Sequence, residues 1–150
     1  MRAPDTTHRT VWCGLWSRRP PVRVPSLTLF VPANHALKLR RVVFERMRET
    51  MTTYDVLAAP VSQVAPFTIE VEWPTEVASV GIGFYTDWFR SCSRLTVTSH
   101  PAVSVPGGFI PGGLPIGLQL IGRHRGDATL LGFAAAFEAA TRFGARRPPR

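Results

Sequence analysis

Nucleophilic side chains gather at one place in the chain, Ser91-Cys92-Ser93. A serine or cysteine attacks a carbonyl group only when a nearby base accepts its proton. The one lysine of the chain, Lys38, stands among arginines in a segment that we expect to form an exposed helix, and it would need burial to act as a neutral base. From the residues alone, we therefore favour a small-residue helix surface for Ser91-Cys92-Ser93 over a nucleophilic site.

No set of residues has the spacing of a metal or cofactor site. The histidines share no metal-ligand spacing, and the two cysteines lie 79 residues apart, which fits neither a Cys-x-x-Cys motif nor a disulfide framework. The sequence also lacks the P-loop, the dinucleotide-binding motif, the zinc-protease motif and the nucleophile elbow. We therefore expect no metal, no cofactor and two free thiols. The residues considered are His8, His35, His100, His124, Cys13 and Cys92.

Two short patterns could belong to a ligand pocket, and each has a structural alternative. Asp87-Trp88-Phe89-Arg90 mixes charge with aromatic rings, as ligand pockets often do, but packing and an ion pair between Asp87 and Arg90 explain it equally well. Gly107-Gly108 could let a ligand approach the backbone closely, whereas a turn between two strands is the favoured interpretation.

The net charge of +8 comes from the two ends of the chain. Residues 1–25 hold five arginines and one acidic residue, residues 142–150 hold four arginines and no acidic residue, and residues 26–141 hold nine of each sign. Because a nucleic-acid-binding domain carries its basic patch on a folded face, this distribution argues against a nucleic-acid partner. The 150 residues suit one domain, and no apolar run is long enough for a membrane span or a signal peptide, so we expect a cytoplasmic protein.

The first half of the chain predicts an irregular lead, a helix and a strand. Residues 1–33 are interrupted by prolines and predict an irregular or disordered segment. Asn34 is a good N-cap for a helix whose apolar stripe consists of Ala36, Leu39, Val43, Met47 and Met51. Residues 54–60 predict a short buried strand, and residues 66–74 alternate as an edge strand or an extended surface segment would.

The second half predicts a helix, two strands and a last helix. Helical spacing favours a core-facing helix over residues 84–97, with an inner face of Phe84, Trp88, Cys92 and Leu95. Residues 102–105 and 116–121 predict strands, and Gly112-Gly113 predicts a turn. Asp127 is expected to cap a last helix that ends near Gly144, with an apolar face of Leu130, Leu131, Ala134, Phe137 and Ala140. This order predicts an α/β fold with too few strands for a large sheet.

The run over residues 100–122 closely resembles a C-terminal stretch of the amidase signature hydrolases. It reads His-Pro-Ala-Val-Ser-Val-Pro-Gly-Gly-Phe-Ile-Pro-Gly-Gly-Leu-Pro-Ile-Gly-Leu-Gln-Leu-Ile-Gly. Other segments resemble the same family in the expected order: the arginine-rich helix leading into residues 54–60, Pro66-Phe67, residues 85–92, residues 122–125 and the helix over residues 130–140. The resemblance covers about residues 36–148, roughly three quarters of the chain, and does not extend to residues 1–33.

The resemblance implies the C-terminal portion of the amidase signature fold, a mixed sheet covered by helices that is incomplete on its own. The family cleaves a carboxylic amide to an acid and ammonia or an amine, with a Ser–cis-Ser–Lys triad and no cofactor. That triad belongs to a Gly/Ser-rich signature upstream of the matched region, and this sequence contains no Gly-Gly-Ser-Ser-Gly run. The resemblance therefore carries no catalytic residue over, and it implies that this chain is inactive alone.

Two pocket candidates come from the resemblance. The helix over residues 85–92 resembles one that approaches the acyl pocket of the family, which makes Trp88 and Cys92 candidate substrate-pocket residues. The sequence departs from the family pattern directly after them, because Ser93-Arg94 replaces what is usually an aromatic or apolar pair. The packing of this helix is therefore expected to differ.

Three segments follow from these observations: a lead over residues 1–33 that is unlike the family, an amidase-like part over residues 34–144, and a basic tail over residues 145–150. A sheet fragment of this kind exposes strand edges and apolar faces. The expected partners are a complementary N-terminal amidase half or a second copy of the chain, with an amide substrate bound only by the complete enzyme. The alternative is a non-catalytic remnant or partner-binding module, and neither a membrane nor a nucleic acid is an expected partner.

Overall fold

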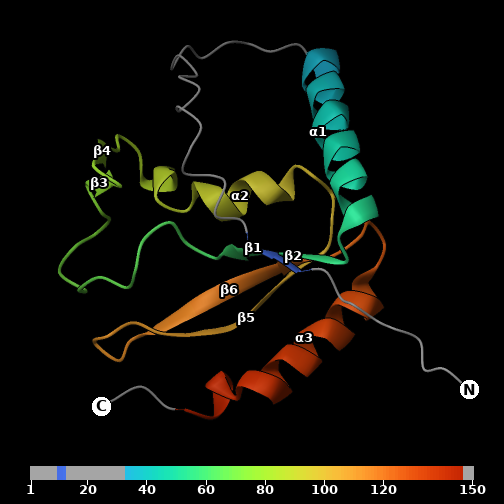
Figure 1. Ribbon diagram of the computed structural model, residues 1–150. Coiled ribbons are helices and arrows are strands. Elements are labelled where there is room, and N and C mark those ends of the chain that lie inside the picture. Colours follow the sequence, from blue (N-terminus) through green and yellow to red (C-terminus); the bar gives the residue numbers. More distant parts are fainter. Residues whose placement is uncertain (1–9, 13–32, 147–150) are drawn as a thin grey trace, which may run out of the picture.

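A four-stranded sheet forms the centre of the computed structural model, which describes residues 10–12 and 33–146 (Figure 1). Its strands run in the order β1-β2-β6-β5. β1 pairs parallel with β2, whereas β2 with β6 and β5 with β6 are antiparallel. The elements in chain order are β1 (Thr10–Trp12), α1 (Ala33–Thr53), β2 (Val56–Pro60), β3 (Glu76–Val77), β4 (Val80–Gly81), the 3₁₀ helix η2 (Tyr85–Asp87), α2 (Arg90–Thr96), β5 (Ala102–Phe109), β6 (Pro115–Ile121), α3 (Asp127–Thr141) and the 3₁₀ helix η3 (Phe143–Ala145).

The strands β5 and β6 form a hairpin where the sequence predicts two strands. Gly107 and Gly108 lie inside β5, at a register shift between Pro106 and Gly108, so their predicted position at a turn is wrong. The turn lies further along, as predicted for Gly112-Gly113. Gly113 has a φ of +82° there, which a glycine adopts without strain, and its N–H donates to Ile110 O at 2.8 Å.

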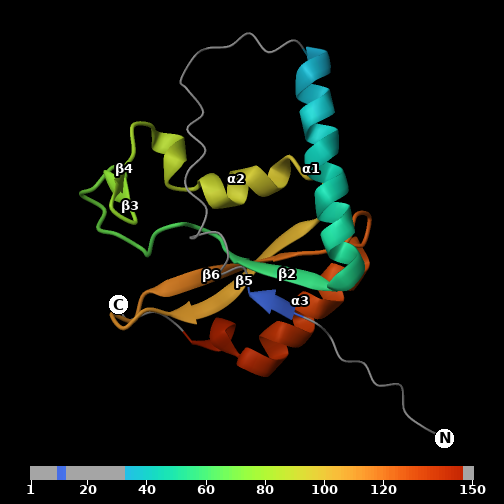
Figure 2. The same ribbon diagram turned by 45° about the horizontal axis from the view of Figure 1, so that its top comes forward.

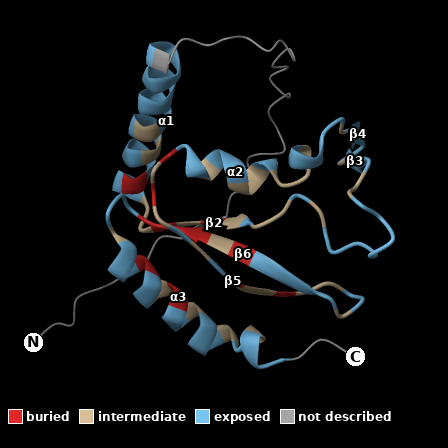
Figure 3. Cartoon of the chain, turned by 180° about the vertical axis from the view of Figure 1, so that it is seen from behind, coloured by how far each residue is buried: buried red, intermediate tan, exposed pale blue. Residues whose placement is uncertain are grey.

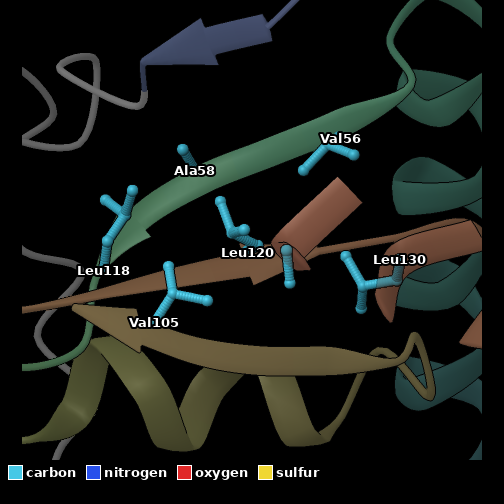
Figure 4. Packing of buried hydrophobic residues seen from close by; sticks show 7 residues of the cluster. Val56, Ala58, Val105, Leu118, Leu120 and Leu130 are labelled. Carbon is cyan, nitrogen blue, oxygen red and sulfur yellow. The ribbon is translucent and has the colours of Figure 1, made fainter. Parts of the chain in front are cut away.

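The core lies between the sheet and α3. Successive side chains of a strand face opposite sides, so alternate residues of β2, β5 and β6 share the face that α3 covers. Leu120 and Ile121 are the largest nearly fully buried side chains, each 1% exposed. The core cluster comprises Val56, Ala58, Val105, Leu118, Leu120, Leu130 and Ala134, and Val103, Phe133 and Phe137 pack against it (Figure 4).

Helix α3 confirms the predicted last helix but begins and ends differently. Asp127 is its first residue and makes no capping bond, because Gly126 occupies the cap position. At the other end, where we expected the helix to end near Gly144, Arg142 is the cap; it adopts the left-handed conformation with a φ of +54°, and its N–H donates to Glu138 O at 2.8 Å. Gly144 lies in η3 instead. The predicted apolar face holds at Leu130, Ala134 and Phe137 but not at Leu131 and Ala140, which are exposed.

Helix α1 confirms the first predicted helix, but its first half stands apart from the sheet (Figures 1 and 2). It begins at Ala33, so Asn34 lies inside the helix rather than at its cap. Met51 is 3% exposed, whereas Leu39 and Val43 of the predicted stripe are 53% and 41% exposed. Figure 3 shows the same gradient along α1, from an exposed start to a buried end.

The buried end of α1 is tied to the connection that follows β6. Arg123 Nε donates to Met51 O at 3.1 Å, and Arg123 Nη2 pairs with Asp55 Oδ1 at 2.9 Å. Further up the helix, Arg40 Nη2 donates to Ser99 Oγ at 2.7 Å. Hydrogen bonds at Arg40 and Met51 therefore tie α1 to the connections before β5 and after β6.

Residues 61–97 form a lobe outside the sheet. Residues 66–74 contain no strand, so the surface segment is the right one of the two predicted alternatives. The small hairpin of β3 and β4 was not predicted. The helix predicted over residues 84–97 is divided between η2 and α2, and neither contains a buried residue, so the predicted core-facing role is wrong.

The predicted α/β class is confirmed. The predicted division of the chain at residues 33 and 145 stays a prediction, since most of the lead and residues 147–150 lie outside the described residues. Three residues of the lead form β1, where we expected irregular chain. No helix in the described part of the chain is both long and apolar enough to cross a membrane.

Candidate functional site

Five aromatic rings, those of Trp88 and four other residues, form a cluster in the outer lobe. Trp88 meets Phe67, Tyr85 and Phe89 edge to face, with ring centroids 5.7, 6.1 and 5.2 Å apart. Tyr85 also meets Phe89 at 5.6 Å and Trp73 at 6.0 Å. Each such pair adds about 0.5–1.5 kcal/mol to the energy of apolar burial. We call these five residues the aromatic cluster.

Two buried polar atoms next to the aromatic cluster, Trp88 Nε1 and Ser91 Oγ, have no hydrogen-bond partner among the described residues. The backbone around them is fixed by Gln63. Its N–H donates to Trp88 O at 3.4 Å, and its Oε1 accepts a hydrogen bond from Ser91 N–H at 2.9 Å. An unpaired buried polar group costs about 1–3 kcal/mol, so a ligand group that bonded these atoms would recover that energy.

Cys92, the second predicted pocket residue, lies half-buried in α2. Its thiol donates to Phe89 O at 2.9 Å, and Ser93 Oγ donates to Arg90 O at 3.2 Å. Both side chains therefore bond the preceding turn of their own helix. For Cys92 and Ser93 this is the arrangement expected of the small-residue helix surface that we favoured, whereas Ser91 is half-buried and its Oγ has no partner among the described residues.

Asp87 and Arg90 form the predicted ion pair across one turn, between Asp87 Oδ1 and Arg90 Nη2. The hydrogen bond from the Arg90 guanidinium holds the pKa of the Asp87 carboxyl below its ordinary value. The carboxylate is therefore ionised and occupied at neutral pH. It helps to hold the end of η2 against α2 and is a poor proton acceptor.

A second polar site, which sequence reasoning missed, joins His100 and His124 beneath α1. Their ring centroids are 6.0 Å apart, and both rings contact Phe44, at 5.4 and 5.1 Å. His100 Nδ1 lies 2.8 Å from Thr98 O, and His124 Nδ1 lies 2.8 Å from Ser99 O. Because a carbonyl oxygen only accepts, each Nδ1 carries the proton.

The pairing of the two predicted strands could have indicated that His100 and His124 lie close together. The register pairs Ala102 with Ile121, and Gly122 N–H donates to Pro101 O at 2.9 Å. An antiparallel pairing that continues in this direction brings His100 beside residues 123–124. Motif spacing along the chain could not reveal this, because the two histidines are neighbours through the sheet.

The other residues considered for chemistry lie away from these sites. Lys38 is exposed on α1, without the burial that a neutral base needs. At Gly107, an added Cβ would lie 3.1 Å from Leu118 Cβ, so the missing side chain lets β5 approach β6 closely. No group of three or more histidine, cysteine or acidic side chains within the described ranges could hold a metal ion.

These observations limit what the described residues can do. The outer lobe offers an apolar aromatic wall with one indole donor and one hydroxyl, which suits binding of a small molecule. The Cys92 and Ser93 side chains bond the preceding turn, Ser91 Oγ has no partner among the described residues, and both rings of the histidine pair contact Phe44 of α1. The arrangement is therefore compatible with a binding surface and supplies no activated nucleophile among the described residues.

The protein-family model described as Amidase matches residues 30–131. Among curated proteins, one component of the glutamyl-tRNA(Gln) amidotransferase of Moorella thermoacetica is 37% identical over 113 residues, which are 75% of this chain and 22% of that protein. The acylamidase of Rhodococcus erythropolis is 34% identical over 99 residues, 65% of this chain and 20% of that protein.

The solved structures point the same way. The chain is similar to a bacterial aryl acylamidase of the amidase signature enzymes, with a TM-score of 0.60 and 31% identity. The likeness covers 77% of this chain and 25% of that one. The chain spans about a fifth of the length of the curated relatives it matches.

Proposed function

Because the chain belongs to the amidase signature family, we propose that it is the C-terminal part of a hydrolase that cleaves a carboxylic amide to an acid and ammonia or an amine. The strongest support is the difference between the share of this chain and the share of the related enzyme that the structural likeness covers. The likeness to the bacterial aryl acylamidase takes in 77% of this chain but only 25% of that protein. A chain of this kind is a piece of the catalytic fold.

In this proposal the Ser–cis-Ser–Lys triad comes from the part of the fold that this chain does not span. The triad would supply the nucleophile and the proton relay, as such constellations do in acyl transfer. The environments of Lys38, Cys92 and Ser93 support this assignment, because Lys38 is exposed and the Cys92 and Ser93 side chains bond the preceding turn. The 150-residue chain alone is then inactive toward amides.

The contribution of this chain is a wall of the substrate pocket. Trp88 lies at the centre of the aromatic cluster with an unpaired Nε1–H, and Cys92 lies one helical turn further on. An aromatic wall with one free donor suits the acyl side of an amide, which combines an apolar group with a carbonyl oxygen.

The test is complementation. The chain is assayed for ammonia or amine release from a panel of amides, first alone and then co-expressed with the N-terminal three quarters of a related amidase. We expect turnover only in the second case, and none when the nucleophilic serine of the N-terminal part is alanine. Turnover by the purified chain alone would show that the triad assignment is wrong.

The pocket assignment is tested in the complemented enzyme. Trp88→Ala is expected to raise KM, whereas Phe84→Ala, which removes a ring that is 65% exposed, serves as the matched control. Equal kinetics for the two variants would remove Trp88 from the pocket. The cytoplasmic location expected from the sequence stays a prediction.

A second candidate function is a partner-binding module without catalysis. The exposed apolar residues of α1 favour it, since Leu37, Leu39, Val42 and Val43 are 41–63% exposed. A complementary N-terminal part would cover them in either case. Stable binding of that part without amide turnover would select the non-catalytic function.

A further inference from the structure

Two segments outside the sheet carry opposite charge and exposed apolar side chains. The first, which we call the basic arm, is residues 34–44 of α1 and contains Lys38, Arg40 and Arg41 but no acidic residue. The second, which we call the acidic arm, is residues 66–77 and contains Glu70, Glu72 and Glu76 but no lysine or arginine. Each arm therefore carries three charges of one sign.

The charges of both arms form no ion pair within the described residues, although hydrogen bonds from its own backbone N–H and from the Thr68 side chain lower the pKa of Glu70. The ion pairs there join Arg48 to Glu45, Arg90 to Asp87 and Arg123 to Asp55, and none uses a charge of either arm. Arg40 donates to the neutral Ser99 hydroxyl. Arg41 lies near Glu45, which is already paired with Arg48.

Each arm also has apolar side chains that no described residue covers. Leu37 and Val42 of the basic arm are 63% and 49% exposed, and Ile69 and Val71 of the acidic arm are 96% and 42% exposed. Exposed apolar side chains bordered by charge of one sign suit a contact with a surface of the opposite charge.

The basic arm and the acidic arm of one molecule lie too far apart to form a contact with each other. α1 and the segment between β2 and β3 lie on opposite sides of α2 in both views (Figures 1 and 2). A two-fold axis near α2 would remove this obstacle, because in a two-fold dimer a residue i that meets j on the partner is matched by j meeting i. Both arms of both copies would then be covered, with three charges against three at each contact.

We propose that a second copy of this chain covers both arms, in a two-fold dimer in which the basic arm of each copy lies against the acidic arm of the other. This goes beyond the proposed function, because it concerns the chain without its complementary part. A polyanion would neutralise only the basic arm, whereas a second copy accounts for both arms together.

The chain offers an unusually specific cross-linking test, because Lys38 is its only lysine. A zero-length carbodiimide reagent joins an amine to a carboxylate in direct contact. We expect a cross-linked peptide that joins Lys38 to Glu70, Glu72 or Glu76, and mixing ¹⁴N- and ¹⁵N-labelled protein should show that the two ends come from different copies. Lys38→Arg should remove the cross-link and keep the dimer.

Charge reversal tests the same contact in solution. Lys38→Glu/Arg41→Glu and Glu70→Lys/Glu72→Lys each place like charges at both contacts, so each should weaken dimerisation about a hundred-fold in sedimentation analysis. An equimolar mixture of the two variants should dimerise again, because both contacts are then complementary. Arg142→Glu/Arg146→Glu changes the net charge equally at the far end of α3 and should leave the dimer intact.

Three results would overturn the proposal: a monomeric wild-type chain at low salt, variants that stay monomeric when mixed, or a control that weakens dimerisation as much as the basic-arm variant. Loss of the wild-type dimer at high salt is expected, since exposed charges are screened. None of these readouts involves amide turnover, so a failure here is distinct from a failure of complementation.

Discussion

Truncation of Leu120 tests whether the core described for this chain forms in the isolated protein. Leu120 is 1% exposed and lies in β6 among Val56, Val105 and Leu130, on the face that α3 covers. Replacing it by alanine removes three buried carbon atoms. At about 0.8 kcal/mol for each, the transfer cost is about 2.4 kcal/mol. The cavity left behind raises the expected loss to about 3–4 kcal/mol.

The assay is thermal and urea unfolding followed by circular dichroism. For a chain of this size, a loss of about 3–4 kcal/mol lowers the midpoint of thermal unfolding by about 10 °C. Leu131→Ala is the matched control, because it makes the same change at a side chain that is 59% exposed, where the expected cost is below about 0.5 kcal/mol. Equal losses for the two variants, or unfolding of the wild type without cooperativity, would refute the described core.

Three smaller perturbations test individual contacts. Gly122→Ala should destabilise the fold by about 1–3 kcal/mol, because the new Cβ would lie 3.0 Å from Leu130 Cβ, whereas Gly132→Ala, with open space around it in α3, should stabilise by up to about 1 kcal/mol in the same unfolding assay. An NMR titration of Asp87 should give a pKa below the ordinary aspartate value, and this pKa should rise in Arg90→Gln. Because the pKa of Asp87 is depressed in the folded state, its ion pair stabilises the fold fully at a pH above the ordinary aspartate pKa. That stabilisation is lost as the pH falls through the pKa of the folded state. Arg123→Gln should speed hydrogen exchange in the last turns of α1, since it removes the bonds to Met51 O and Asp55, and unchanged exchange would show that Met51 burial alone holds that end.

Elements with a strong local period could be predicted from the sequence. The helix from Ala33, the strands before and after the Gly112-Gly113 turn and the last helix all follow from repeats of apolar residues that need no knowledge of the fold. Helix ends were predicted less well. Arg142 rather than Gly144 adopts the left-handed conformation at the end of the last helix.

The residues of the candidate sites depended on contacts that local patterns do not contain. The aromatic cluster joins Phe67 and Trp73 to Trp88 through the fold of the outer lobe. The histidine pair depends on the hairpin register. In both cases the residue types were visible in the sequence, and only the strand pairings and loop paths determine which of them meet.

The prediction that the helical segment after Phe84 faces the core was wrong, and this result bears on function. Its apolar spacing is real, yet η2 and α2 bury no residue, and the first half of α1 shows the same combination. Apolar faces at helical spacing indicate burial against something. In the proposed function, the surface that covers both helices belongs to the part of the amidase fold that this chain does not span. The chain spans about a fifth of the length of the curated relatives it matches.

The two proposals assign that covering surface differently, and they compete for α1. A complementary amidase part and a second copy of the chain would both bury the apolar residues of the basic arm, so binding of one excludes the other. Addition of the complementary part to the dimer should therefore release monomer in proportion to the amide turnover that it restores, as measured by light scattering and ammonia release on one sample. Restored turnover with an intact dimer would show that the basic arm is not shared, and the two-fold contact would then have to lie elsewhere.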